Sequence, residues 1–439
     1  MISESLENVK GKLRKIVHDL NEHISKPQQK YLLEMIPGCF ATGSLNITAI
    51  SGYLRERVKV KHTVKRLQRN TEQYWSLLEI SNLYNIHSCY EETLKDERVL
   101  ISVDGGDLVH DYGKSFEYMS QVRDGSSKRK SINNGYFLNH AVCYSFSSKR
   151  VLPLYLDIHS STSVDFKSAN TETIKLLDKL EQKFKDKGIF VMDRGYDAGV
   201  ILEYLYERDL SFIIRSVGNR HVSYKGQNVP VSKLCQSVIN KRYKKKGFSY
   251  GYGKCYYKGR PITVISVKGS EKGNYVYLLC EGHISKSKEA FFRIKSYFKR
   301  WKVEESFRFM KQQLGIEKCL VRKFDSIKTM LGIASFCWNL LSQIESDRLL
   351  ALELERMSGR EKYNTKKKTV CKFMHYRISD GIRNMLLSCN KKLFRFRDKR
   401  YLSDMVHYMK IPYYLEKYRE RDTIDGIPVI KRKKSSLVA

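Results

Sequence analysis

The stretch "RVLISVDGGDLVH", residues 98–110, marks the point where the chain changes from a helical to a strand-like pattern. Its residues alternate as they do in a β-strand. Two more strand patterns follow at 135–146 and 150–158, separated by a short turn. A helix, a short apolar strand, a second helix and a last strand complete the series, at 171–184, 188–197, 200–206 and 211–217. This order predicts a mixed sheet flanked by helices, which is an α/β fold.

Composition and pattern divide the whole chain into successive regions. The residues before the first strand read as helical, and a segment rich in Tyr, Lys and Gly with short strand patterns interrupts the α/β region as a β-rich insertion. The residues after the α/β region are basic and mostly helical, and they are the candidate for dimerisation. The predicted boundaries are 1–95, 96–217, 218–285, 286–345 and 346–439, with the second and fourth ranges forming one core.

The charge of the chain is strongly unbalanced. It carries 81 Lys and Arg against 47 Asp and Glu, a formal net charge of +34. Such a balance predicts a protein that binds nucleic acid, and a ribosome-associated or membrane-surface protein is the alternative. The sequence has no signal-peptide pattern or apolar run long enough to span a bilayer, and its ten cysteines form no CxxC pair. We therefore expect a cytoplasmic protein with reduced thiols and no zinc site.

The segment at 46–70 predicts two short helices joined by a turn. Apolar residues recur at helical spacing in both, with Val60, Val64 and Leu67 on the second. The polar face of the second helix is basic and includes Lys61, Lys65 and Arg66. This arrangement is similar to a helix-turn-helix, whose second helix enters the major groove of DNA. A solvated basic helix with no partner is the alternative.

The stretch "YFKRWKVEESFRFMK", residues 297–311, is predicted to lie in a long helix that begins near Ser287 and ends at Gly315. Four of its side chains fall within a sector of roughly 60° at about 100° per residue, namely Tyr297, Arg300, Glu304 and Lys311. Glu305 is rotated away by about 100°. The alternative is that Arg300 and Glu304 form an ordinary surface ion pair.

Two aspartates stand where strand patterns of the α/β region end, Asp104 after the first and Asp193 after the fourth. Carboxylates at strand ends, joined by a third from a following helix, can hold two divalent cations such as Mg²⁺. Such a pair of ions supports in-line phosphoryl displacement, and basic side chains beside it grip the flanking phosphates. Asp104, Asp193 and Glu304 are therefore the candidate catalytic and metal-binding residues, with Mn²⁺ expected to substitute.

The helix resembles the Y-x2-R-x3-E-x6-K signature of bacterial insertion-sequence transposases of the DDE type, the insertion-sequence-4 family. Its flank "RWKVEESF" follows the same family, "FVMDRGYDAG" resembles its second acidic motif and "ISVDGGDLVHDYG" its first. The similarity covers about residues 96–345. It implies an RNase H-like core, a Mg²⁺-dependent enzyme, double-stranded DNA as partner, a homodimer in the synaptic complex, and a nucleoid-associated bacterial protein without membrane contact.

The resemblance assigns roles residue by residue. Asp104, Asp193 and Glu304 become the metal-binding triad, and Tyr297, Arg300 and Lys311 would contact transposon-end DNA near the cleaved phosphate. Further expectations are that Trp301 packs at the helix base and that Lys128 and Arg129 lie in a DNA-facing loop. One position departs from the family: Gly106 stands where Ser or Thr is common, which leaves Asp107 as a rival to Asp104. Asp197 is a weaker rival to Asp193.

The expected function is therefore that of a DNA transposase, which binds terminal inverted repeats and catalyses strand cleavage and transfer. Two alternatives stay open. A related two-metal nuclease on the same fold would need neither the Tyr/Arg/Lys-bearing helix nor the insertion. A non-catalytic DNA-binding descendant of a transposase would be expected to have lost one of the acids, whereas all three candidates are present.

Overall fold

The protein is described by a computed structural model. The residues that it describes are 2–74, 76–110, 115–123, 132–237, 243–245, 248–268, 275–359, 373–388, 423–424 and 427–428. Residues 1–389 form one compact unit, and residues 390–439 form a second unit. Lys128 and Arg129, the predicted DNA-facing loop, lie outside the described residues, as does most of the C-terminal region after Ser388.

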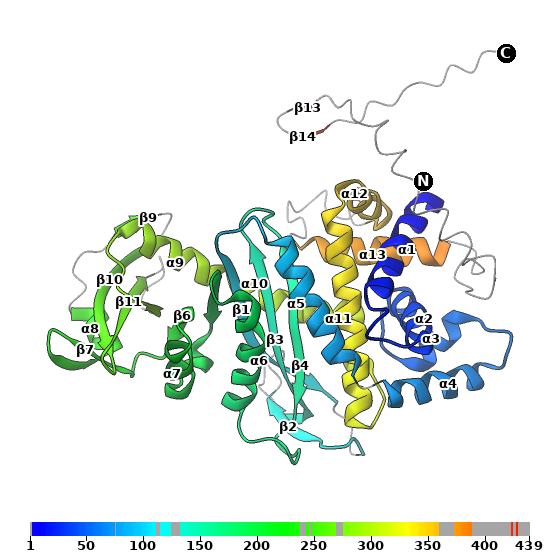
Figure 1. Cartoon of the computed structure of the whole chain (residues 1–439), viewed down its shortest axis with the longest axis horizontal. Coiled ribbons are helices and arrows are strands. Elements are labelled where there is room, and N and C mark those ends of the chain that lie inside the picture. The colour runs from blue at the N-terminus through cyan, green and yellow to red at the C-terminus, as the bar shows by residue number, and fades with distance from the viewer. Residues whose placement is uncertain are drawn as a thin grey trace. The chain divides into compact units, whose positions relative to one another are not determined.

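The centre of the first unit is a sheet in the strand order β4-β3-β1-β5-β6 (Figure 1). Strands β1 (Val99–Val109), β3 (Ile132–Ser145) and β4 (Val151–His159) pair antiparallel, and β5 (Gly188–Met192) and β6 (Ser211–Ser216) run parallel to β1. Three antiparallel strands followed by two parallel strands, with a helix before each parallel strand, make an RNase H-like core. The predicted α/β fold is confirmed.

Both faces of this sheet are apolar, and helices cover each of them. Ile101, Val103 and Phe190 face the cluster built by α5 (Leu77–Glu92), α6 (Ala169–Phe184) and α7 (Gly199–Glu207). The opposite face carries Leu100 and Val191 and is covered by α9 (Ser287–Lys299). Because successive side chains of a strand point to opposite faces, one strand can contribute to both clusters.

The predicted β-rich insertion extends the same sheet. It contains β7 (His221–Tyr224), β8 (Gln227–Pro230), α8 (Val231–Ser237), β9 (Tyr243–Lys245), β10 (Phe248–Tyr257), β11 (Arg260–Lys268) and β12 (Tyr275–Glu281). Strand β12 pairs antiparallel with β6, so β10, β11 and β12 continue the sheet outward from the core. A further short strand, β2 (Ser120–Arg123), pairs with β3 at the other side.

The long helix that carries Glu304 is interrupted. Helix α9 ends at Lys299 and α10 (Trp301–Phe309) begins two residues later, and a π-helical turn over Met310–Leu314 follows. Gly315 ends the run with φ 57°, the left-handed conformation that glycine adopts without cost. The predicted stop is confirmed, and the prediction of one continuous helix is wrong.

The N-terminal helices are α1 (Ile2–Asp19), α2 (Lys26–Thr42), α3 (Ile47–Leu54) and α4 (Val60–Gln73). All of them except α3, which packs on α2 and α4, contact α11 (Phe324–Ser346). Helices α12 (Arg348–Met357) and α13 (Met374–Ser388) follow α11. Helices α3 and α4 are the predicted pair, and Asn46 caps α3 by accepting from the N–H of Ala49. Among the helices that the structure describes, none combines the length and apolar character that a membrane span requires.

The buried side of α4 differs from the prediction. Thr63, Leu67 and Thr71 are buried, whereas Val60 is 47% exposed. Of the three apolar residues that the periodicity predicted to be buried, only Leu67 is buried. The buried side of α4 runs through Thr63 rather than through Val64. Lys61 and Lys65 are exposed on α4, as a DNA-contacting face requires.

Candidate active site

The parallel pairing of β1 and β5 brings two carboxylates together. Its last register pair is Val103 with Met192, and the next residue on each strand is Asp104 and Asp193. The β5 sequence "GIFVM" is fully buried, and the polar "DRGYD" that follows turns away from the sheet in a short 3-10 turn at Arg194–Tyr196. The two acids therefore occupy equivalent positions at the carboxyl edge of the parallel pair.

Asp104 was expected at the end of a strand, and this is wrong in detail. Strand β1 continues to Val109, still paired with β3, so Asp104 lies inside the strand at the point where β5 stops. Beyond that point the β5 side of β1 has no neighbouring strand among the described residues. An acid can therefore remain accessible in the middle of a long strand.

Gly106 lets α10 approach β1 closely. A Cβ atom at position 106 would stand 2.8 Å from the ring of Phe307, which is closer than side chains normally come. Phe307 lies one helical turn beyond Glu304, so its packing on Gly106 fixes the distance of Glu304 from the sheet. The place that a Ser or Thr side chain would take is filled by this ring, which explains the departure at position 106.

Helix α10 and the end of α9 direct their side chains toward the two aspartates. Arg300 donates from Nη1 to Oδ2 of Asp104 (2.7 Å) and from Nη2 to Oε1 of Glu304 (2.5 Å). The hydroxyl of Tyr297 donates to Oδ1 of Asp193 (2.9 Å). Tyr297 thus contacts Asp193, and Arg300 joins Asp104 to Glu304. The i, i+4 ion pair of Arg300 and Glu304, predicted as the alternative, is present as part of this larger cluster.

The three carboxylates interact electrostatically. The pKa of Asp104 is raised to about 6: burial is the largest cause, the negative charges of Glu304 and Asp193 add to it, and Arg300 opposes it. Burial also acts on Asp193, but its pKa is lowered because it accepts from the N–H of Arg194 and lies near Arg300. Repulsion between neighbouring carboxylates favours a cation beside them, and Arg300 is that cation in this structure.

The two rival aspartates are engaged elsewhere. Lys311 donates to Oδ2 of Asp107 (2.7 Å) and contacts Glu317 (3.0 Å). The structure therefore does not place Lys311 with Tyr297 and Arg300: the π-helical turn carries it to a separate group of acids farther along β1. Asp197 accepts from the Ser216 hydroxyl, the N–H of Val217 and the Arg220 guanidinium, and its side chain is only 2% exposed.

Sequence reasoning missed Arg215 and misjudged Trp301. Arg215 on β6 lies 3.5 Å from Oδ1 of Asp193, and the signal was a lone cation inside the apolar strand pattern "SFIIRSV". Trp301 was expected to pack at the helix base, but it is 58% exposed, which corrects that prediction. Arg66, predicted to contact DNA, is bonded to Glu34 (2.7 Å) and Glu56 (3.1 Å) between the N-terminal helices.

The donor set suits a hard divalent cation, because carboxylate oxygens are the ligands that Mg²⁺ prefers. Within the described residues, no group of three or more His, Cys, Asp or Glu side chains is arranged to hold a metal ion. At this site the Arg300 guanidinium bonds one oxygen each of Asp104 and Glu304. The residues fit a metal in type and in charge, and a metal ion bound by these two carboxylates would compete with Arg300.

The fold and this arrangement define an RNase H-like protein with a cluster of acids at the carboxyl edge of its parallel strands. Residues 122–340 match the family model described as a transposase DDE domain. The chain therefore contains a transposase DDE domain. Asp193 and Glu304 lie inside the matched residues, and Asp104 precedes them.

Two solved structures are similar to the chain at 13% sequence identity. One is the cryo-EM structure of the piggyBac transposase synaptic complex with hairpin DNA, with a TM-score of 0.36 over 71% of this chain and 58% of that chain. The other is the crystal structure of the NurA nuclease from Sulfolobus solfataricus, with a TM-score of 0.25 over 55% of this chain and 97% of that chain. No curated protein matches the sequence. The chain spans little more than half the length of the piggyBac chain, since the similarity covers 58% of that chain.

Proposed function

We propose that the protein is a DNA transposase that binds the terminal inverted repeats of its own element, cleaves a strand at each end and joins the freed ends to target DNA. The observation that carries this proposal is the meeting of Asp104, Asp193 and Glu304 around Arg300 and Tyr297, from three separate elements. The transposase DDE domain over residues 122–340 supports it.

Transposases of the DDE type generally use divalent metal ions, and Asp104, Asp193 and Glu304 would hold them here. A bound Mg²⁺ or Mn²⁺ ion would activate the attacking oxygen and stabilise the leaving oxygen during phosphoryl transfer. The metal would replace the positive charge that Arg300 now supplies to Asp104 and Glu304.

The protein's own side chains would position the acids and the DNA. Tyr297 and Arg215 both contact Oδ1 of Asp193, and Phe307 packs α10 against β1. Once released from a carboxylate, the Arg300 guanidinium would have a phosphate oxygen as its natural new partner, because it matches both groups in charge and geometry. Arg300 would thus exchange an internal anion for a DNA phosphate as substrate and metal enter.

Recognition of the ends is proposed for the N-terminal region. Lys61 and Lys65 are exposed on α4, and Arg66 would act by fixing α4 on its neighbours through Glu34 and Glu56. Chemistry at paired ends requires two copies of the chain, so a homodimer is part of the proposal, with the C-terminal region as the candidate for pairing.

A cleavage assay tests the proposal. End-labelled DNA from both flanks of the gene is incubated with the wild type, Glu304→Gln or Asp193→Asn, in Mg²⁺ or in Ca²⁺. We expect Mg²⁺-dependent nicking at a matched pair of inverted repeats, and neither variant should nick although both still bind the DNA. Binding without wild-type cleavage would favour the inactive descendant, and cleavage without sequence preference would favour the two-metal nuclease.

A further inference from the structure

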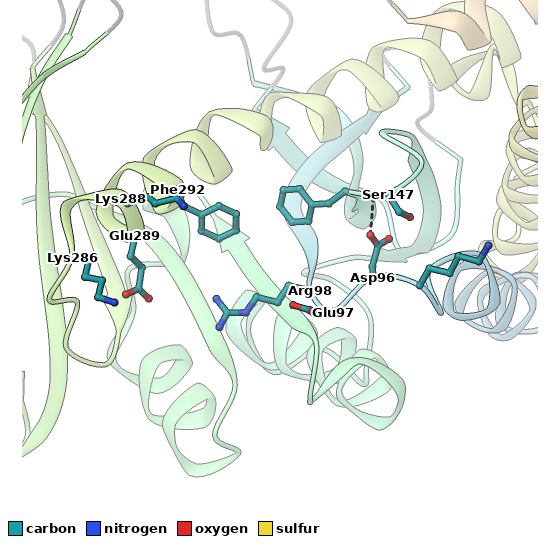
Figure 2. Close-up of a pocket in the computed structure, with 10 residues that line it drawn as sticks. Asp96, Glu97, Arg98, Ser147, Lys286, Lys288, Glu289 and Phe292 are labelled. Atoms are coloured by element: carbon teal, nitrogen blue, oxygen red, sulfur yellow. Dashed lines mark hydrogen bonds between the residues drawn. The ribbon is translucent and has the colours of Figure 1, made fainter. Parts of the chain in front are cut away.

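A shallow groove of about 630 Å³ lies at the opposite end of β1 from the acids. It is bounded by the connection from α5 to β1, the turn between β3 and β4, and the beginning of α9 (Figure 2). Asp104 is five residues beyond Val99, which is about 16 Å along a strand. The groove is therefore separate from the candidate active site, and its size lies within the range of roughly 300–1,000 Å³ that is usual for ligand sites.

The rim of the groove is cationic. It carries the exposed side chains of Lys95, Arg98, Lys286 and Lys288, and none of these has an ion-pair or hydrogen-bond partner among the described residues. The acids on the rim are fewer, Glu97 and Glu289. Asp96 is buried, and it accepts from the Ser145 hydroxyl (2.6 Å) and from the N–H of Ser147 (2.7 Å). The groove therefore presents unpaired positive charge to a ligand.

The lining is aromatic. Phe146 and Phe292 are partly buried against the core, with ring centroids 5.6 Å apart, and Figure 2 shows Phe292 projecting from α9 toward the space above Arg98. Tyr144 packs edge-on against Phe146 at 5.5 Å and carries the ammonium group of Lys299 3.7 Å from its ring centroid. Aromatic rings beside unpaired cations are the features on which proteins stack the bases of unpaired nucleic-acid strands.

Helix α9 connects this groove with the acids. It begins at the groove, and its exposed side chains include Lys295 and Phe298 before the chain reaches Arg300 and Glu304. Phe298 is 50% exposed. The bases of an intact duplex are stacked inside it and cannot reach an aromatic floor, whereas a freed strand can. Aromatic and cationic side chains along one helix thus favour an unpaired strand over duplex DNA.

We propose that this groove, here called the Phe292 groove, binds an unpaired segment of DNA that runs along α9 from the acids. Arg98, Lys286 and Lys288 contact its phosphates, and Phe146 and Phe292 stack on its bases. The inference takes its substrate class from the proposed function, because cleavage at an element's end releases such a strand. The binding itself requires no metal and no catalysis.

The experiment measures binding of a fluorescent oligothymidine strand and of a matched duplex to the full-length protein in EDTA, as a function of salt. The test variants are Lys286→Ala/Lys288→Ala and Phe292→Ala, with Phe292→Leu to keep the packing. The control is Lys183→Ala/Lys185→Ala, which removes the same charge from the end of α6, on the opposite face of the sheet.

We expect the Lys286/Lys288 variant to reduce the slope of log affinity against log salt for the single strand by about 1.4, since each phosphate contact contributes about 0.7. Both Phe292 variants should weaken single-strand binding roughly fivefold or more, with duplex binding unchanged. The α6 control should leave the slope unchanged.

Three results would overturn the inference: an equal loss in the α6 control, a loss for the duplex as large as for the single strand, or no loss in any variant. A photocrosslink from 5-iodouracil in the strand to Phe146 or Phe292 gives a second, site-specific measurement. If Mg²⁺-dependent cleavage at inverted repeats persists while groove binding is absent, only the groove inference fails. If groove binding is present and no such cleavage exists, only the proposed function fails.

Discussion

Asp193 and Asp197 lie on the same short loop after β5 and have opposite environments. Asp197 is 2% exposed, and a hydroxyl, a backbone N–H and a guanidinium occupy its oxygens. Asp193 has partners of the same kinds, the Tyr297 hydroxyl, the N–H of Arg194 and the Arg215 guanidinium at 3.5 Å, but its side chain is 29% exposed. The first is a saturated carboxylate that fixes the loop to β6, and the second is an open carboxylate that can accept a new ligand.

Two acids of β1 also differ in their surroundings. Asp107 forms an ion pair with Lys311. Asp104 shares Arg300 with Glu304, and the negative charges of Glu304 and Asp193 raise its pKa. Motif spacing alone leaves both members of each pair as candidates. Their surroundings separate them: Asp104 and Asp193 lie near Arg300 and near each other, whereas Asp107 and Asp197 pair with Lys311 and Arg220.

The largest effect is expected from Asp193→Asn. The substitution keeps the shape of the side chain but removes a charge that a divalent cation would need, and several kcal/mol of transition-state stabilisation correspond to about a thousandfold or more in rate. Strand cleavage of inverted-repeat DNA should fall by that factor, and the thermal unfolding midpoint should stay near that of the wild type. Retention of cleavage within about tenfold would remove Asp193 from the site.

Asp197→Ala should have the opposite outcome. It leaves the Arg220 guanidinium and the Ser216 hydroxyl without their buried partner, and breaking one side of a buried ion pair costs about 3–5 kcal/mol. We expect a large drop in the urea midpoint of unfolding. Ser216→Ala removes one hydrogen bond to the same carboxylate and the acceptor of the Gly218 N–H, and at about 1 kcal/mol for each bond it should cost about 2 kcal/mol. A midpoint equal to that of the wild type for Asp197→Ala would contradict the assignment of Asp197 as structural.

A third prediction concerns how close α10 lies to the open acids. In Gly106→Ala the new methyl group meets the Phe307 ring at 2.8 Å, and overpacking of this kind costs about 1–3 kcal/mol. Because the same helix carries Glu304, cleavage should fall as well. Gly105→Ala is the matched control, since its nearest contact outside the adjoining residues is the Tyr196 hydroxyl at 3.5 Å. Equal behaviour of the two variants would show that α10 does not depend on this contact.

The smallest effect is expected in the pH dependence of the free energy of unfolding. It concerns Glu345, a carboxylate that contacts Arg150 and His375. It is partly buried, which raises its pKa, but the bond from His375 (3.1 Å) and the nearby Arg150 prevail and lower it below the ordinary value of 4.5. Trp338 donates to the other ring nitrogen of His375 (3.0 Å), so the ring donates toward Glu345.

A carboxylate whose folded pKa is depressed stabilises the protein above its unfolded pKa, and this stabilisation is lost as the pH falls through the folded pKa. The stability difference between the wild type and Glu345→Gln should therefore be constant near neutral pH. Below about pH 4.5 it should shrink, by at most about 1.4 kcal/mol per pH unit. A difference that widens in acid would contradict this sign.

Local patterns in the sequence predicted the succession of strands and helices in the core, the helix pair at α3 and α4 and the stop at Gly315, because periodicity and a left-handed glycine are local signals. They did not show that Asp104 lies inside β1 at the point where the pairing with β5 stops, because the end of a parallel pairing depends on the neighbouring strand. The local patterns also did not predict that Trp301 is exposed, because periodicity does not say which side of a helix is covered by other elements. The partners of Asp197 come from β6 and the loop after it, far from its own motif.

Iron-directed cleavage of the protein chain tests most directly whether the three open carboxylates share one metal site. Fe²⁺ replaces Mg²⁺, and ascorbate with peroxide then produces radicals that cut the backbone next to the bound ion. We predict cuts close to Asp104, Asp193 and Glu304 together, which excess Mg²⁺ suppresses and which Asp193→Asn greatly weakens. Cuts that are scattered, that persist in excess Mg²⁺, or that gather around Asp107 and Glu317 would contradict the account.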